Sequence, residues 1–185
     1  MGRIKSAWEI ALEKTADIQF DADKFRTENL IKEGRTLAGS YLINADMKIS
    51  EVSERISSYS DSTEKCTVLN GMSEVVMLNL ALPQDESFKF RFKRLTEISG
   101  LINPDSVKLM NEIENFFSEY ISSRDSMVSS LEQQIRQAMQ SNPQSVNSEQ
   151  YSQIIKSNLD ELNSRYSDYL ESSKEQLRAL LVQSE

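Results

Sequence analysis

The sequence lacks histidine altogether and holds only one cysteine, Cys66, among its 185 residues. Without histidine, the chain alone cannot build a Ser-His-Asp triad, a Cys-His dyad or a histidine-ligated zinc or iron site. A lone thiol cannot form a zinc knuckle or an intramolecular disulfide. The five glycines match neither a P-loop nor a dinucleotide-binding fingerprint. We therefore predict that the protein is not an enzyme, and the sequence identifies no cofactor, no metal ligand and no small-molecule substrate.

Long apolar runs and excess positive charge are missing too. No run approaches the roughly 20 apolar residues that span a bilayer, and the most apolar stretch, residues 72–82, contains Ser73, Glu74 and Asn79. We expect a buried core segment there and no membrane span. The 21 basic residues are outnumbered by 29 acidic ones, and the net charge of −8 disfavours duplex DNA or an anionic bilayer as the main partner. The single cysteine fits a reducing compartment, so we predict a cytoplasmic location.

Only three prolines are present, Pro83, Pro104 and Pro143, and each lies where a helix should stop or start. They divide the chain into four blocks. At the second break we expect Gly100 to adopt the left-handed conformation that follows many helices, and Asn103 to cap the next helix.

Apolar residues recur at helical spacing through the first two blocks. We expect an amphipathic helix over about residues 4–15, anchored in the core by Trp8, the only tryptophan. A second helix should begin near Asp21 or Asp23 and break near Asn44, although two glycines interrupt its apolar positions.

The segment after this break is less regular. Residues 45–59 carry a short heptad seam that predicts either a continuation of the second helix or a third one. Residues 57–65 are polar and serine-rich and indicate a loop or a solvated turn. Asn70-Gly71 is the one hairpin signal in the chain. We favour a helix over residues 66–82, because the apolar run that follows is long for a strand and rich in Met and Leu.

The strongest pattern lies in the last two blocks. Apolar positions step by four and three residues from Val107 to Ala138, and the rhythm repeats from Ile155 to Leu180. A short connection around Pro143 requires the two runs to be antiparallel neighbours. The sequence therefore predicts a coiled-coil-like helical hairpin with arms of about 50 Å at ~1.5 Å per residue. Arms of this length exceed the width of a compact domain, so part of the hairpin should project.

The arms of the hairpin are polar and rich in serine, and such helices gain most of their stability by burying a seam. Tyr166, Tyr169 and Ser173 occupy seam positions. We expect full burial of these side chains only against the N-terminal bundle or a partner. Tyr166 and Tyr169 are therefore candidate interaction residues.

Residues 88–94 alternate aromatic and basic side chains without a gap. As a strand, the segment would place rings on one face and cations on the other, the arrangement that binders of single-stranded nucleic acid use. As a helix that begins near Asp85 and Glu86, it would carry a basic outer face that suits an acidic partner. We favour the helix. The candidate interaction residues of this segment are Lys89, Arg91, Lys93 and Arg94.

Two stretches near the N-terminus carry a family resemblance. Residues 2–15, Gly-Arg-Ile-Lys-Ser-Ala-Trp-Glu-Ile-Ala-Leu-Glu-Lys-Thr, and residues 34–42, Gly-Arg-Thr-Leu-Ala-Gly-Ser-Tyr-Leu, resemble short helical bacterial proteins of a domain-of-unknown-function family seen chiefly in spirochaetes. The corner at residues 80–83, Leu-Ala-Leu-Pro, adds to this resemblance. The resemblance implies a bacterial, cytoplasmic protein. It implies no activity, cofactor or site residue.

These patterns predict an all-α protein with an N-terminal helical bundle over residues 1–103 and an antiparallel helical hairpin over residues 104–185. The predicted function is that of a structural or protein-interaction protein that acts through its hairpin, with a protein partner or by self-association. The alternative is a nucleic-acid-associated protein that uses residues 88–94. The negative net charge disfavours nucleic acid as a partner.

Overall fold

The computed structural model describes residues 22–141 and 148–182, and within these ranges every regular element is a helix. The predicted all-α fold is confirmed for this part of the chain. Its six helices are α2 (Ala22–Ile43), α3 (Ile49–Ser57), α4 (Ser62–Asn79), α5 (Phe88–Ile102), α6 (Ser106–Ser141) and α7 (Ser148–Leu181). The helix expected over residues 4–15, with Trp8, and the turn around Pro143 lie outside the described residues.

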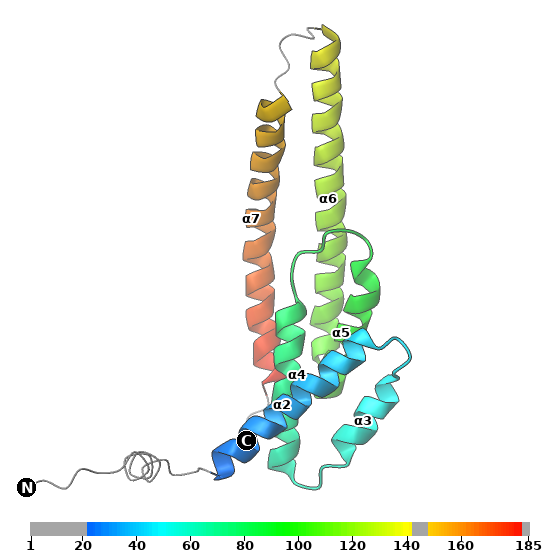
Figure 1. Ribbon diagram of the computed structural model, residues 1–185, viewed down its shortest axis with the longest axis vertical. Coiled ribbons are helices and arrows are strands. Elements are labelled where there is room, and N and C mark those ends of the chain that lie inside the picture. The colour runs from blue at the N-terminus through cyan, green and yellow to red at the C-terminus, as the bar shows by residue number, and fades with distance from the viewer. Residues whose placement is uncertain (1–21, 142–147, 183–185) are drawn as a thin grey trace, which may run out of the picture.

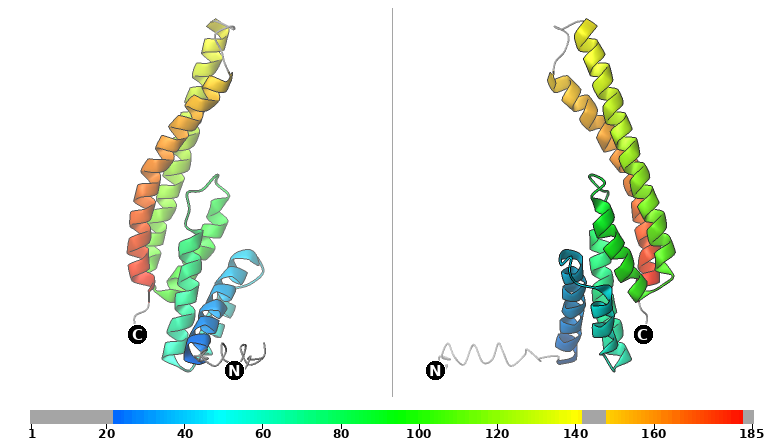
Figure 2. Two further views of the ribbon diagram at one scale, coloured as in Figure 1. Left: turned by 60° about the vertical axis from the view of Figure 1, so that its left-hand side comes forward. Right: turned by 90° about the vertical axis from the view of Figure 1, so that its right-hand side faces the viewer.

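The helices form a short bundle and a long hairpin (Figure 1). Helices α2 to α5 pack together at one end, while α6 and α7 lie antiparallel along one flank of the bundle and extend well past it (Figure 2). The arms contain 36 and 34 residues, which gives lengths of about 54 and 51 Å at ~1.5 Å per residue. The predicted hairpin is therefore present with nearly the predicted arm length, and part of it projects.

The corner between α5 and α6 corrects one prediction and confirms another. Gly100 lies inside α5 and no described glycine has a positive φ, so the expected left-handed conformation is wrong. The position is closely packed, because a Cβ added there would lie 2.9 Å from Cγ2 of Val107, and this side chain would have to shift. Asn103 does cap the next helix, since its Oδ1 accepts from the N–H of Asp105 at 3.0 Å. Its Nδ2 also donates to the carbonyl of Leu180 at 2.9 Å and ties the end of α7 to this corner.

Helix α4 runs without interruption through Asn70 and Gly71, so the favoured helix is confirmed and the hairpin alternative is wrong. The helix begins earlier than the apolar run that predicted it. Asp61 caps its start by accepting from the N–H groups of Thr63 and Glu64 at 2.8 and 3.4 Å. The serine-rich loop is correspondingly short and occupies only the residues between α3 and α4.

Helices α2 and α4 cross in close contact, because each carries a glycine at the crossing point. A Cβ on Gly34 would lie 2.0 Å from the carbonyl oxygen of Val68, and a Cβ on Gly71 would lie 2.2 Å from that of Ile31. The two backbones therefore approach more closely than side-chain-bearing residues would allow. Gly34, which the sequence pattern presents as an interruption of the helix, is a packing position.

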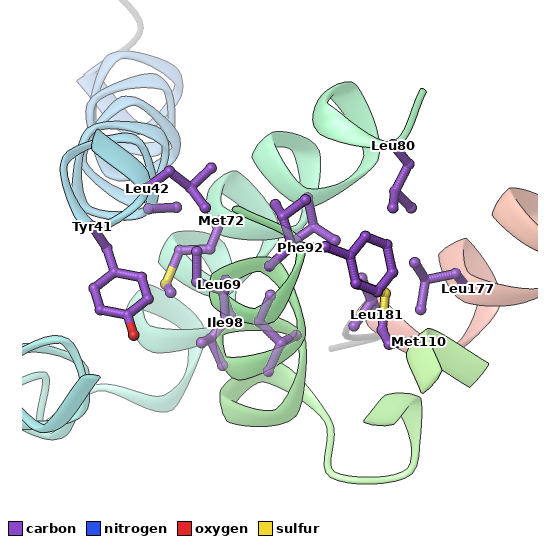
Figure 3. Close-up of a cluster of buried hydrophobic side chains, with 14 of the residues drawn as sticks. Tyr41, Leu42, Leu69, Met72, Leu80, Phe92, Ile98, Met110, Leu177 and Leu181 are labelled. Atoms are coloured by element: carbon purple, nitrogen blue, oxygen red, sulfur yellow. The ribbon is translucent and has the colours of Figure 1, made fainter. Parts of the chain in front are cut away.

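One hydrophobic core joins the bundle to the base of the hairpin. Figure 3 shows Phe92 of α5 beside Met110 of α6 and Leu177 and Leu181 of α7, and all four are at most 3% exposed. Burial of a large apolar side chain contributes roughly 1.5–3 kcal/mol, so this cluster fixes the hairpin to the bundle. The boundary at residue 103 falls between α5 and α6, and the division into two domains stays a prediction.

Candidate interaction site

Residues 88–94 form the first half of α5, so the favoured helix is confirmed and the strand alternative is wrong. The helix separates the three phenylalanines. Phe88 and Phe92 turn inward, where their rings contact the ring of Phe117 edge-to-face at centroid distances of 5.7 and 5.5 Å. Phe90 lies outside and is 60% exposed. The segment therefore presents no continuous row of rings for base stacking.

The exposed cations of α5 have polar neighbours. Lys89 pairs with Glu86 at 2.5 Å, and Arg91 donates to Oδ1 of Asn79 at 2.5 Å. Lys93 is exposed beside an open pocket of about 550 Å³ that two glutamates also line. This side of α5 is therefore mixed in charge rather than uniformly basic.

Arg94 differs from the other three predicted cations because it is buried, with 7% of its surface exposed. Its guanidinium donates to the backbone carbonyls of Tyr41, Asn44 and Met47 at 2.8–2.9 Å, and to that of Ala45 at 3.4 Å. It also lies 3.8 Å from the centroid of the Tyr41 ring. The end of α2 needs such donors, because the last carbonyls of a helix have no partner within it. Arg94 thus belongs to the core and not to an exposed interaction surface, which corrects the prediction for this residue.

Two tyrosines in the bundle should make the fold sensitive to alkaline pH. Burial and the hydrogen bond from its hydroxyl to the carboxylate of Glu97 raise the pKa of Tyr41 to about 12. Burial and the carboxylate of Glu33 raise the pKa of Tyr59 to about 12 as well. In the unfolded chain both phenols ionise near pH 10. The stability that they contribute is fully present below about pH 10 and should be lost as the pH rises from about 10 to 12.

Urea unfolding followed by circular dichroism at a series of pH values measures this effect. The free energy of unfolding should fall between about pH 10 and 12, and it should fall less steeply in Tyr41→Phe, which has no phenol to ionise at that position. A free energy of unfolding that stays level up to pH 12 would contradict the prediction.

The two candidate tyrosines of α7 lie against α6 in an aromatic cluster. The ring of Tyr169 stacks on that of Phe116 at a centroid distance of 4.3 Å and an interplanar angle of 31°. The ring of Tyr166 contacts Phe116 at 5.0 Å and Tyr120 at 5.1 Å. The hydroxyls of Tyr166 and Ser123 share a hydrogen bond of 3.1 Å. The structure therefore brings the two predicted residues together.

The predicted seam residues of α7 are buried to different degrees. Ser173 is 3% exposed, and its hydroxyl donates to the carbonyl of Tyr169 at 3.0 Å. Tyr166 is half-buried, whereas Tyr169 is 50% exposed. The chain therefore buries the serine by itself and leaves part of both tyrosine rings open to a partner.

An open pocket of about 510 Å³ lies beside this cluster, and we call it the aromatic pocket. Its lining residues come from α6 and α7 alone: Glu112, Asn115, Phe116, Glu119, Arg165, Tyr166 and Tyr169. Arg165 pairs with Glu161, one turn earlier on α7. Glu112 and Glu119 are exposed and form no ion pair with any residue in the described ranges. The pocket thus combines open aromatic surface with two carboxylates that form no ion pair in the described residues and with one arginine, Arg165, that pairs with Glu161.

The part of the hairpin that extends past the bundle (Figure 1) has a less complete core than its base. Its seam, which we call the distal seam, consists of Val128, Leu131, Ile135 and Ala138 of α6 with Ile155, Leu159 and Leu162 of α7, all of them half-buried. At the base, Ile113, Phe117 and Leu177 are at most 2% exposed. Met139 and Ile154 add apolar surface to the distal part, with exposed fractions of 50% and 46%.

The acidic and cysteine side chains of the described residues do not gather into a metal-binding cluster. In the ranges that the structure describes, no group of three or more acidic or cysteine side chains is placed to hold a metal ion. None of the helices in these ranges is both long and apolar enough to cross a bilayer. We accordingly take the distal seam and the aromatic pocket as the candidate sites.

A family model matches the part of the chain that carries these surfaces. It is the model of a family of unknown function, DUF6657, and the match covers residues 53–179. The chain belongs to this family. The DUF6657 match includes α4, α5, α6 and nearly all of α7, so both candidate sites lie inside it. A search of curated proteins gives no match, and neither does a search of solved structures.

The predicted resemblance to a family of unknown function is confirmed at this general level. The DUF6657 match lies outside residues 2–15 and 34–42, which carry most of the resemblance, and includes the corner at residues 80–83. Membership of DUF6657 says nothing about spirochaetes, so the origin of the protein in these bacteria stays a prediction.

The sequence patterns do not single out Phe116 and Tyr120, which complete the aromatic cluster. A signal for them is present in the sequence, because they are four residues apart on α6 while Tyr166 and Tyr169 are three apart on α7. Residues at these spacings share one face of a helix. In an antiparallel hairpin, two such aromatic faces can meet.

Proposed function

We propose that this member of DUF6657 is a non-enzymatic protein-interaction protein that acts through the projecting part of its hairpin. The half-buried distal seam is the observation that supports this function. The two arms leave the flanks of this apolar stripe partly exposed, whereas three or four helices cover such a stripe on more sides. A further helical surface laid on the distal seam would therefore bury area that now faces water and stabilise the arms.

A second copy of the chain is the partner that we favour. Its hairpin has the same length and the same apolar stripe, so two hairpins can pair about a twofold axis into a four-helix arrangement. Such symmetric pairing is the commonest form of oligomer among soluble proteins. The cytoplasmic location and the bacterial origin accompany this proposal as predictions from the sequence.

Self-association should depend on exposed apolar side chains of the distal part. We expect Met139→Glu with Ile154→Glu to raise the dimer dissociation constant by tenfold or more, because two desolvated apolar contacts are worth roughly 1.5–3 kcal/mol each. Both side chains are about half exposed, so the hairpin itself should still fold. Light scattering over a concentration series measures the effect.

Leu78→Glu is the matched control. Leu78 is 81% exposed but lies on α4 in the bundle, so this change should leave the dissociation constant unaltered. A mass of one chain at high concentration, together with no partner in a pulldown from the native cell, would remove the support for the proposed function.

Binding of single-stranded nucleic acid stays the alternative hypothesis. Of the four cations on which it depends, Lys89, Arg91 and Lys93 are exposed, and Phe90 is a neighbouring ring that is 60% exposed. The inward rings of α5 and the burial of Arg94 leave it fewer contacts than the sequence suggests. Titration with single-stranded oligonucleotides across a salt series separates the two hypotheses, because phosphate contacts weaken steeply with salt.

A further inference from the structure

We propose that the aromatic pocket binds a cationic side chain, arginine or lysine, presented by a peptide segment of a protein partner. The pocket residues lie outside the distal seam, so this binding site is additional to the proposed self-association. The inference combines three features of the pocket, namely its rings, its carboxylates and its shape.

The rings provide a surface that attracts cations. Phe116 lies in contact with both tyrosines of α7, at 4.3 Å from Tyr169 and 5.0 Å from Tyr166. These contacts hold the rings in place, while Tyr169 is still 50% exposed. An aromatic face carries partial negative charge and binds a guanidinium or an ammonium group within about 6 Å of its centre.

The carboxylates add full negative charge at the same place. Glu112 and Glu119 are seven residues apart on α6, or about 10 Å along the helix at ~1.5 Å per residue, with Asn115 between them. Neither forms an ion pair within the described part of the chain. Arg165, the one cation among the described lining residues, pairs with Glu161, which is not a lining residue. A partner cation can therefore reach the rings and a carboxylate together.

The shape of the pocket favours a peptide side chain over an enclosed small molecule. At about 510 Å³ it is large enough for a long side chain and part of its backbone. It is an open groove between two helices, so a chain can cross it while one side chain enters. A guanidinium is planar and stacks on rings while it donates to carboxylates, which makes arginine the better fit.

An NMR titration of the full chain with an acetylated and amidated tri-arginine peptide tests the proposal. Backbone amide signals around Phe116 and Tyr169 should shift and give a dissociation constant. The tri-citrulline peptide has the same shape without the charge and should cause no shift. Tetramethylammonium chloride tests whether the pocket instead binds a small free cation. If tetramethylammonium binds as tightly as tri-arginine, the assignment to a peptide partner is overturned.

Substitutions of pocket residues should weaken the binding of tri-arginine by different factors. Glu112→Gln with Glu119→Gln should weaken tri-arginine binding about five- to tenfold. Tyr169→Ser should weaken it about two- to fivefold, and Tyr169→Phe should keep it within about twofold, because the ring and not the hydroxyl attracts the cation.

Glu132→Gln with Glu175→Gln is the matched control, since it removes the same charge from exposed positions on the same two helices outside the pocket. It should leave binding within about twofold of the unmodified chain, because charges beyond roughly 8–10 Å are screened at physiological salt. Equal weakening by the two double variants would show attraction to net charge alone and overturn the proposal, as would the absence of any shift. Neither result bears on self-association, which the distal variants test separately.

Discussion

Gly34→Ala should lower the free energy of unfolding by about 3 kcal/mol, which is the upper range for overpacking a core. The added Cβ would lie 2.0 Å from the carbonyl oxygen of Val68, 3.0 Å from its carbonyl carbon and 3.1 Å from the amide nitrogen of Met72. All three atoms belong to the backbone of α4, so no side-chain rotation relieves the clash. The two helices must move apart, and the buried contacts along their crossing are lost.

Intrinsic helix propensity acts in the opposite direction, because it favours alanine over glycine. A second glycine of the same helix allows the propensity effect to be measured without the clash. Alanine is favoured over glycine inside a helix by about 1 kcal/mol. Gly39 lies on the same helix, and a Cβ added there would meet no described atom within 4 Å apart from its chain neighbours and the nearby backbone of α2. Gly39→Ala is therefore the control, and it should raise the free energy of unfolding by about 0.5–1 kcal/mol.

Urea unfolding monitored by circular dichroism measures both variants. Gly71→Ala makes the reciprocal clash with Ile31, at 2.2 Å from its carbonyl oxygen, and it should destabilise the protein by a similar amount. The double variant should cost less than the sum of Gly34→Ala and Gly71→Ala, because the first change already separates the helices. A Gly34→Ala protein as stable as Gly39→Ala would show that the crossing is not close.

The ends of the helices could be predicted from the sequence because they depend on residues that are neighbours in the chain. Asn103 and Pro104 mark the start of α6, and α2 ends beside Asn44 as expected. The glycines are harder to interpret. Gly34 and Gly71 indicate a helix interruption and a turn when only their neighbours in the chain are considered, whereas their role depends on a contact between segments almost 40 residues apart. No periodicity within one segment reports such a contact.

Prediction of the candidate interaction residues from the sequence has the same limit, because it considers each segment separately. The heptad pattern of α7 is enough to select Tyr166 and Tyr169, but their partner Phe116 belongs to the other arm and depends on the register of the hairpin. The alternating pattern of residues 88–94 treats its cations as equivalent. In a helix, however, Arg94 lies one turn before the buried Ile98 and points into the core with it.

Arg94→Met should lower the free energy of unfolding by about 3 kcal/mol. Methionine keeps much of the apolar length and removes every donor. The carbonyls of Tyr41, Asn44 and Met47 then lose donors at 2.8–2.9 Å in a buried to partly buried site. Arg94→Lys retains the charge but lacks the planar fork that reaches several carbonyls at once, so it should cost about 1–2 kcal/mol.

Arg91→Met is the control for Arg94→Met, because Arg91 is exposed on the same helix and, within the described residues, makes a single hydrogen bond, to Asn79. It should change the free energy of unfolding by no more than about 0.5 kcal/mol.

Hydrogen exchange distinguishes a local role of Arg94 at the end of α2 from a general effect on stability. If Arg94 caps the end of α2, amides of the turn between α2 and α3 should exchange faster in Arg94→Lys, while those of α6 change only with global stability. Uniform acceleration, or an Arg94→Met protein as stable as Arg91→Met, would contradict the capping role, because a cap acts first on the helix end that it covers.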